Sequence, residues 1–196
     1  IAYVRLTRFT RNCASEVEEA IRELTDENDV KGLVLDLRGN PGGLLNESVS
    51  LCNLFIDKNQ EVVSTKGKIK DWEKSYKTMK EPLYKGLPLA VLINQSSASA
   101  SEIVSGTIQD LDRGVILGKK SFGKGLVQQT RKLSYNSQLK VTVAKYYTPS
   151  GRCIQALDYT NKNDDGSVGK VADSLKTAFK TRNGRTVYDG GGIDPD

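Results

Sequence analysis

Short apolar runs alternate with amphipathic stretches along the first part of the chain. Residues 31–38 and 89–94 are rich in branched apolar side chains and bounded by turn residues, which is typical of buried strands. Apolar residues between these runs recur at helical spacing. The pattern predicts an α/β fold with a mostly parallel sheet whose working loops lie at the carboxyl ends of its strands. We expect strands at 1–6, 31–38, 61–65, 89–94 and 115–117, and helices over 14–24, 44–56 and 103–111.

The second half of the chain favours antiparallel pairing. Residues 126–133 and 138–147 both alternate, which predicts a β-hairpin near the C-terminal end. The lysine-rich segment 66–80 is interrupted by Asp71 and Glu73, so we interpret it as an exposed hairpin or lid rather than a nucleic-acid surface. We expect a single domain over residues 1–196, with a polar insertion at 158–190 that is too rich in glycine and charge to form its own core.

Composition excludes several kinds of chemistry. The 196 residues include no histidine, which removes histidine triads, Cys–His dyads and histidine metal sites. The three cysteines, Cys13, Cys52 and Cys153, are widely spaced and form no CxxC, so neither a zinc cage nor a disulfide framework is expected, and Cys13 and Cys52 fit buried helical faces. The net charge of +5 is spread along the chain, and no apolar run reaches the ~18 residues of a membrane span.

A serine cluster follows the apolar run 89–94. Ser97, Ser99 and Ser101 stand where a buried strand gives way to a helix, beside backbone N–H groups that the helix leaves free. One of these serines is therefore a candidate nucleophile. The alternative is that Ser99 only caps the helix, because Ser99 and Glu102 have the spacing of a capping box, and capping serines are commoner than catalytic ones.

Lys124 is the candidate base. In a chain without histidine, a serine nucleophile requires a carboxylate, a terminal amine or a lysine. Lys124 lies between two glycines after the next expected strand, so its loop should reach the same sheet edge as the serines. A lysine base must be neutral, which means lowering its pKa from ~10.4 to near 7 by burial, at about 4 kcal/mol. The alternative is an ordinary surface cation.

The same lysine closes a partial phosphate-binding motif. Residues 118–124 fit G-x-x-x-x-G-K, but Gly125 stands where a serine or threonine should bind magnesium. Residues 126–130 also have the pattern of a strand, whereas a P-loop opens a helix. Nucleotide binding is therefore a weak hypothesis.

A third loop, at residues 36–43, also follows a buried strand. Its paired glycines, Gly42 and Gly43, let backbone amides approach a substrate, as an oxyanion hole requires, although the same residues could form only a tight turn.

Four stretches together resemble the carboxyl-terminal processing, or tail-specific, serine proteases. They are Leu-Asp-Leu-Arg-Gly-Asn-Pro-Gly-Gly at 35–43, Ser-Ala-Ser-Ala-Ser-Glu-Ile at 97–103, Phe-Gly-Lys-Gly-Leu-Val-Gln at 122–128 and Tyr-Thr-Pro-Ser-Gly-Arg at 147–152. They occur in the family's order and cover most of the chain. The family's Gly-Ile-x-Pro-Asp ending is present at 192–196, but residues 158–190 separate it from the preceding turn.

The resemblance implies a crotonase-like (ClpP/crotonase-type) α/β core with a Ser–Lys dyad that uses no metal, nucleotide or other cofactor. Ser99 would be the nucleophile, Lys124 the general base and Gln128 a residue that orients the lysine. The backbone N–H groups of Ala100 and Gly43, with Gly42 the competing candidate, would form the oxyanion hole. The expected reaction is endopeptidase cleavage near the C-terminus of protein substrates through an acyl-enzyme, with the substrate adding to a sheet edge near Gly43.

The resemblance also implies partners and a location. Such proteases carry a PDZ domain before the protease core, and none is present in these residues, so we expect the chain to be part of a longer protein. Protein substrates with accessible C-terminal tails are the expected partners, and a bacterial periplasmic or cell-envelope location is implied. The alternative function is a non-catalytic peptide-binding or scaffold domain of the same fold.

Overall fold

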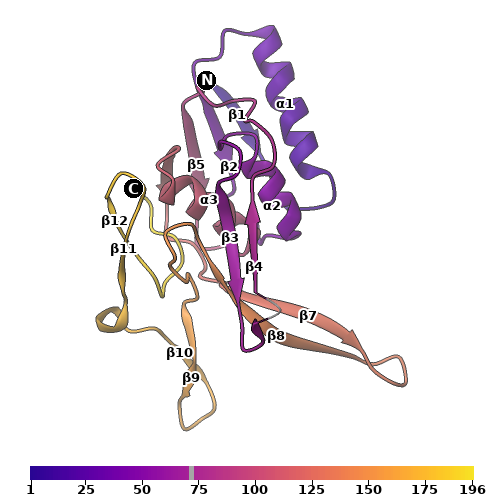
Figure 1. Cartoon of the computed structure of the whole chain (residues 1–196), viewed down its shortest axis with the longest axis vertical. Coiled ribbons are helices and arrows are strands. Elements are labelled where there is room, and N and C mark those ends of the chain that lie inside the picture. Colours follow the sequence, from indigo (N-terminus) through magenta and orange to yellow (C-terminus); the bar gives the residue numbers. More distant parts are fainter. Residues whose placement is uncertain (71–72) are drawn as a thin grey trace.

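A parallel sheet and an antiparallel sheet lie on either side of a group of helices in the computed structural model, which describes residues 1–70 and 73–196 (Figure 1). The parallel sheet has the strand order β1-β2-β5-β6. In its register Leu35 lies between Val4 and Val91, and all three side chains are buried. Its strands are β1 (Ala2–Arg5), β2 (Leu33–Asp36), β5 (Leu89–Ile93) and β6 (Val115–Gly118), which confirms the β-α units predicted from the apolar runs.

Three helices pack against one another in chain order. They are α1 (Cys13–Glu27), α2 (Leu45–Cys52) and α3 (Ala100–Asp110). The helix α3 contacts β6 of the parallel sheet and β3 of the antiparallel sheet, and each of its residues is buried. Cys13 and Cys52 are buried free thiols, as expected from their helical positions. The central position of α3 fixes the loop that precedes it, which carries the serine cluster.

The antiparallel sheet has the strand order β4-β3-β8-β7. The pairing of β7 (Leu126–Lys132) with β8 (Gln138–Tyr147) confirms the predicted hairpin. The pairing of β3 (Glu61–Lys66) with β4 (Lys74–Lys77) confirms a hairpin in the lysine-rich segment, where Asp71 lies outside the described residues. This second sheet makes the fold a mixed α/β fold: the parallel pairing predicted from the sequence holds for the first sheet alone.

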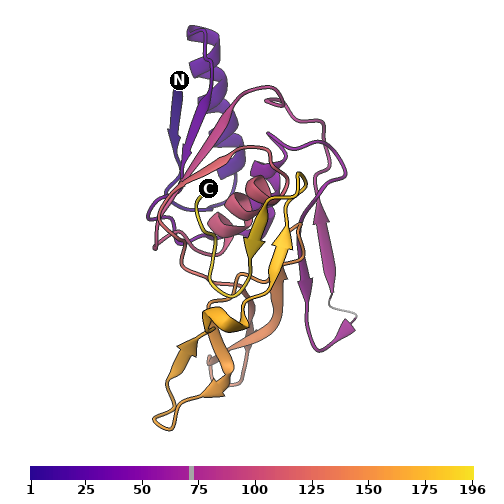
Figure 2. The same cartoon turned by 90° about the vertical axis from the view of Figure 1, so that its left-hand side faces the viewer.

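The segment predicted as an insertion, residues 158–190, contains two hairpins. The first pairs β9 (Leu157–Lys162) with β10 (Val168–Lys170) and projects from the same end of the molecule as β7 and β8 (Figure 1). After the short helix η2 (Asp173–Leu175), the second pairs β11 (Ala178–Lys180) with β12 (Thr186–Tyr188) and lies beside α3 (Figure 2). A hydrogen bond from Arg182 N to the carbonyl oxygen of Asp110, 2.8 Å long, joins the second hairpin to the end of α3.

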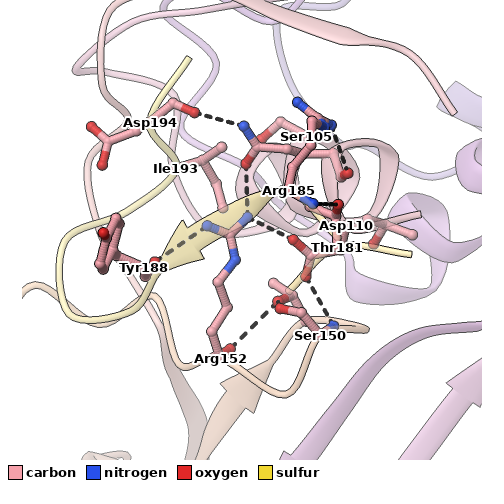
Figure 3. A network of polar contacts seen from close by, with 12 residues as sticks. Ser105, Asp110, Ser150, Arg152, Thr181, Arg185, Tyr188, Ile193 and Asp194 are labelled. Atoms are coloured by element: carbon pink, nitrogen blue, oxygen red, sulfur yellow. Dashed lines mark hydrogen bonds and ion pairs between the residues drawn. The ribbon is translucent and has the colours of Figure 1, made fainter. Parts of the chain in front are cut away.

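A buried ion pair anchors the C-terminal end of α3 (Figure 3). The guanidinium of Arg152 is 1% exposed and donates to Asp110 Oδ1 at 2.7 Å, to Gln109 Oε1 at 2.8 Å and to the carbonyl oxygen of Tyr188 at 3.2 Å. The backbone N–H of Ser150 donates to Asp110 Oδ2 at 3.0 Å. The turn at 147–152 therefore ties α3 to the last hairpin.

No helix in the part of the chain that the structure describes is both long enough and apolar enough to cross a membrane.

Candidate active site

Three loops meet at the carboxyl ends of β2, β5 and β6. The N–H of Ala98 donates to the carbonyl oxygen of Asn40 at 3.0 Å, which joins the loop after β2 to the serine loop after β5. The N–H of Phe122 donates to the carbonyl oxygen of Ser97 at 3.0 Å, which joins the serine loop to the lysine loop after β6. The predicted meeting of these loops at one sheet edge is confirmed.

Ser99 has a backbone conformation that capping alone does not explain. Its φ is 56° and its ψ is −112°, whereas N-cap residues ordinarily adopt extended backbone angles. Such a conformation costs a non-glycine residue roughly 1–3 kcal/mol and is concentrated at functional sites. Gly42 lies directly against it: a β-carbon on Gly42, whose φ is 94°, would be 2.8 Å from Ser99 Cβ and 2.6 Å from the carbonyl oxygen of Ala98. A glycine at position 42 is thus required by the packing around the serine.

Glu102 connects the serine loop to the lysine loop. Its carboxylate is fully buried in the first turn of α3. Oε2 accepts the backbone N–H of Ser99 at 2.8 Å and the backbone N–H of Lys124 at 2.9 Å. Oε1 accepts the hydroxyl of Ser121 and the N–H of Gly123, each at 2.6 Å. The capping box predicted for Ser99 and Glu102 is therefore only part of what this carboxylate does.

The four hydrogen bonds of Glu102 favour its ionised form, whereas burial favours the neutral form. Burial raises the pKa of the carboxyl group, and the four hydrogen bonds oppose that rise. Burial is the larger effect, so the pKa of Glu102 lies above its ordinary value. The carboxyl group is thus a buried acceptor for three backbone N–H groups and one hydroxyl.

Two backbone N–H groups beside Ser99 are open. The N–H of Gly42 donates to Asn40 Oδ1 at 2.9 Å, so it is occupied. The N–H groups of Gly43 and Ala100 have no acceptor within residues 1–70 and 73–196. Open, fixed amides next to a nucleophile can stabilise an oxyanion. Of the two glycines considered from the sequence, Gly43 is the one whose N–H is available.

The side chains of Lys124 and Gln128 are both exposed. Within the described residues neither makes a hydrogen bond, to the other or to Ser99. The backbone of Lys124 is thus fixed next to Ser99, while its amino group is not engaged.

Tyr146 and Ser121 are neighbours of the site that the sequence patterns did not indicate. Tyr146 is buried on β8, its N–H donates to the carbonyl oxygen of Gly125 at 2.8 Å, and its phenol faces the Ser99 side chain. Burial raises the pKa of this phenol, so it is a neutral hydroxyl near neutral pH. Ser121 donates to Glu102 and accepts the N–H of Ile193 at 2.6 Å.

The shape of the first loop depends on a second buried carboxylate, Asp36. It accepts two hydrogen bonds from the Arg38 side chain, at 3.0 and 2.8 Å, and one from the Tyr3 hydroxyl at 2.5 Å. Burial opposes the ionisation of Asp36, but these hydrogen bonds outweigh it and lower its pKa to about 2. The pair stiffens the start of the loop that carries Gly42 and Gly43.

The structure also bears on nucleotide and metal binding, the two other kinds of site considered from the sequence. Residues 118–125 lead into the strand β7 and not into a helix, so the helix start that a P-loop needs is missing there. Clusters of three or more cysteine, aspartate or glutamate side chains arranged for a metal ion are not found among the described residues.

A mixed α/β fold brings a strained serine, a lysine loop and two backbone amides without acceptors among the described residues to one sheet edge, an arrangement that hydrolases use. Comparison with known proteins agrees: the model of peptidase family S41 matches residues 1–162, and the chain belongs to this family.

Relatives with this similarity are carboxyl-terminal processing proteases. The chain is 44% identical over 163 residues to a carboxy-terminal-processing protease of Bartonella bacilliformis, covering 82% of this chain and 37% of the relative. It is 39% identical over 157 residues to a probable CtpA-like serine protease of Staphylococcus aureus, covering 79% of this chain and 31% of the relative. The photosystem II D1 C-terminal processing protease matches with a TM-score of 0.70 at 38% identity, covering 78% of this chain and 39% of that one. The chain thus spans less than two fifths of each.

Proposed function

We propose that the chain is the protease core of a serine endopeptidase that cleaves near the C-terminus of protein substrates. Ser99 is the nucleophile, Lys124 the general base and no metal or nucleotide takes part. The observation that carries this proposal is the carboxylate of Glu102, which accepts the backbone N–H groups of Ser99 and Lys124 through one oxygen. Membership of peptidase family S41 supports the same reaction.

The proposed chemistry is acyl transfer. Ser99 Oγ attacks the substrate carbonyl carbon and its proton passes to Lys124 Nζ. The carbonyl oxygen, now negative, accepts the N–H groups of Gly43 and Ala100. As the peptide bond breaks, Lys124 gives the proton to the leaving amine, and an ester joins the substrate acyl group to Ser99. Water, deprotonated by the same lysine, then attacks the ester carbon. The bond to Ser99 Oγ breaks, the lysine returns the proton to Ser99 Oγ, and the substrate carboxylate leaves.

The side chain of Lys124 is exposed, so other groups must cover it before it can act as a base. A lysine can act as a general base only through its neutral amino group, and removing water from around that group favours the neutral form. We infer that bound substrate, together with a PDZ domain in the full-length protein, covers Lys124 and turns its amino group toward Ser99 and Gln128. We also propose that the core is crotonase-like and that the protein lies in the bacterial periplasm or cell envelope.

A second candidate function is a peptide-binding domain that has lost turnover. The observation that favours it is that the Lys124 side chain makes no hydrogen bond or ion pair within residues 1–70 and 73–196. It would bind a tailed peptide and release it uncut.

The test compares substitutions of Ser97 and Ser99, whose side chains have different contacts. Ser97 Oγ donates to the carbonyl oxygen of Leu37 at 2.8 Å and accepts the N–H of Asn94 at 2.9 Å, so it is a structural group. In the full-length protein, Ser99→Ala is expected to lower kcat for a substrate with an accessible C-terminal tail by about 10³-fold or more. The Ser97→Ala variant is expected to lose about 1–3 kcal/mol of unfolding free energy and to keep its turnover when folded.

Cleavage is measured by mass spectrometry of the products at a temperature where both variants are folded. An Ser99→Ala enzyme that cleaves at the wild-type rate contradicts the assignment. A wild-type protein that binds the tailed substrate but never cleaves it establishes the second candidate instead.

A further inference from the structure

A groove of about 820 Å³ lies beside the lysine loop and apart from Ser99. Lys145 and Tyr147 line it, whereas Tyr146 between them belongs to the hydrophobic core. Since side chains alternate along a strand, the groove lies on the face of the antiparallel sheet that points away from the helices. Its opposite wall is formed by residues 153–159 and by the ends of the two C-terminal hairpins near 171–175 and 189–190.

Three lysines in the groove form no ion pair among the described residues. Lys66 and Lys145 lie directly opposite each other on the paired strands β3 and β8, and Lys68 follows two residues later. Like charges in this position destabilise a sheet. Among the described residues no ion pair involves any of the three, and the ammonium of Lys66 lies 4.9 Å from the ring centre of Tyr147. The groove therefore presents positive charge that an external anionic group would balance.

The rest of the groove lining contains both apolar side chains and carboxylates. Leu126, Leu157, Val171 and Leu175 supply apolar surface, and Asp158 and Asp189 supply two carboxylates. Asp189 accepts the backbone N–H of Thr177 at 2.7 Å, so it is fixed in the wall. Carboxylates in the wall disfavour a uniform polyanion such as a nucleic acid. A polypeptide that carries both apolar and acidic side chains matches this lining.

The groove is linked to the lysine loop by a hydrogen bond and by the strand that follows the loop. Gln155, in the groove wall, accepts the N–H of Gly125 through Oε1 at 2.8 Å. Leu126 and Gln128, on the strand β7 that follows the lysine loop, also line the groove. A polypeptide held there passes next to the loop that carries the lysine.

We propose that this groove is a substrate-binding site outside the cleavage site, and that it selects polypeptide segments combining apolar and acidic side chains. This inference rests on the proposed peptidase function, because it gives the groove a role in selecting the substrates of that peptidase. The lysines at 66, 68 and 145 contact the acidic side chains, and the leucine and valine side chains of the opposite wall contact the apolar ones.

The experiment measures binding in the full-length protein carrying Ser99→Ala, so that no turnover is needed. The probes are a fluorescein-labelled peptide of alternating leucine and glutamate, and its counterpart with lysine in place of each glutamate. Adding Lys145→Glu is expected to weaken binding of the glutamate peptide about tenfold. The matched control is Lys140→Glu, which makes the same change of charge at an exposed position of β8 outside the groove and is expected to weaken binding less than about twofold. Lys68→Glu is a second groove variant, and circular dichroism verifies the fold of each.

The outcomes separate the groove from the cleavage site. Equal weakening by Lys145→Glu and Lys140→Glu, tighter binding of the lysine peptide, tighter binding of a single-stranded oligonucleotide, or no binding would each overturn the proposal. In the active protein, Lys145→Glu is expected to raise KM for an acidic substrate about tenfold with kcat unchanged. If the wild type cleaves nothing while the binding pattern holds, the proposed function fails and the groove stands.

Discussion

Glu102→Gln is expected to lower kcat for a tailed substrate by about 10²-fold, because it separates the loops that carry Ser99 and Lys124. The carboxylate has a donor pair at each oxygen. A glutamine must place its NH₂ group against one of these pairs. Whichever pair it faces, at least one buried backbone N–H is left without an acceptor, which costs about 1–3 kcal/mol and displaces the loop.

The measurement is kcat and KM for cleavage, together with thermal unfolding. Glu23→Gln makes the same change of charge on the exposed side of α1 and serves as the control. Ser121→Ala removes one donor and leaves the two backbone N–H groups of Ser99 and Lys124 paired with Glu102, so a smaller loss is expected. A Glu102→Gln enzyme that folds and keeps wild-type kcat would show that the carboxylate does not position the pair.

Arg152→Ala is expected to destabilise the fold by about 3–5 kcal/mol, because it leaves Asp110 charged, buried and without its cation. Asp110 is the last residue of α3, the helix that begins directly after Ser99. The same guanidinium also donates to Gln109 and Tyr188, so its loss removes contacts to the C-terminal hairpin as well.

Chemical denaturation of the variants measures this effect. Lys31→Ala is the matched control, because its ion pair with Asp29 is exposed, with side chains 73% and 83% accessible, and is worth at most about 1 kcal/mol. The double variant Arg152→Met with Asp110→Leu is expected to be more stable than Arg152→Ala, since it leaves no unpaired charge. Equal unfolding free energies for Arg152→Ala and Lys31→Ala would contradict a stabilising role for the buried pair.

The sequence predicted the parts of the fold that local patterns determine. Short branched runs such as 89–93 have few alternatives to a buried parallel strand, and this topology brings the loops after β5 and β6 to one edge. The meeting of the Ser99 and Lys124 loops thus followed from strand order alone. The pairing of Ser64 on β3 with Tyr147 on β8 did not, because it joins strands far apart in the chain.

The role of Glu102 in joining the two loops could not be predicted from the sequence. Glu102 has the spacing of a capping box, which accounts for one of its hydrogen bonds and gives no sign of the other three. Those three partners come from the lysine loop, and their meeting with Glu102 depends on tertiary packing. The positive φ of Ser99 could not be predicted either, because Ser99 packs against Gly42, which is far away in the sequence.

The most direct test of the central claim, that Ser99 and Lys124 work as one catalytic pair, is the cleavage rate of the full-length protein in a double-mutant cycle. Ser99→Ala, Lys124→Ala and the double variant are compared with the wild type on one tailed substrate. Residues that act as a unit give non-additive losses, so we expect the double variant to be about as slow as the slower single variant. Losses that multiply in the double variant, or near wild-type cleavage by Lys124→Ala, would contradict the pair.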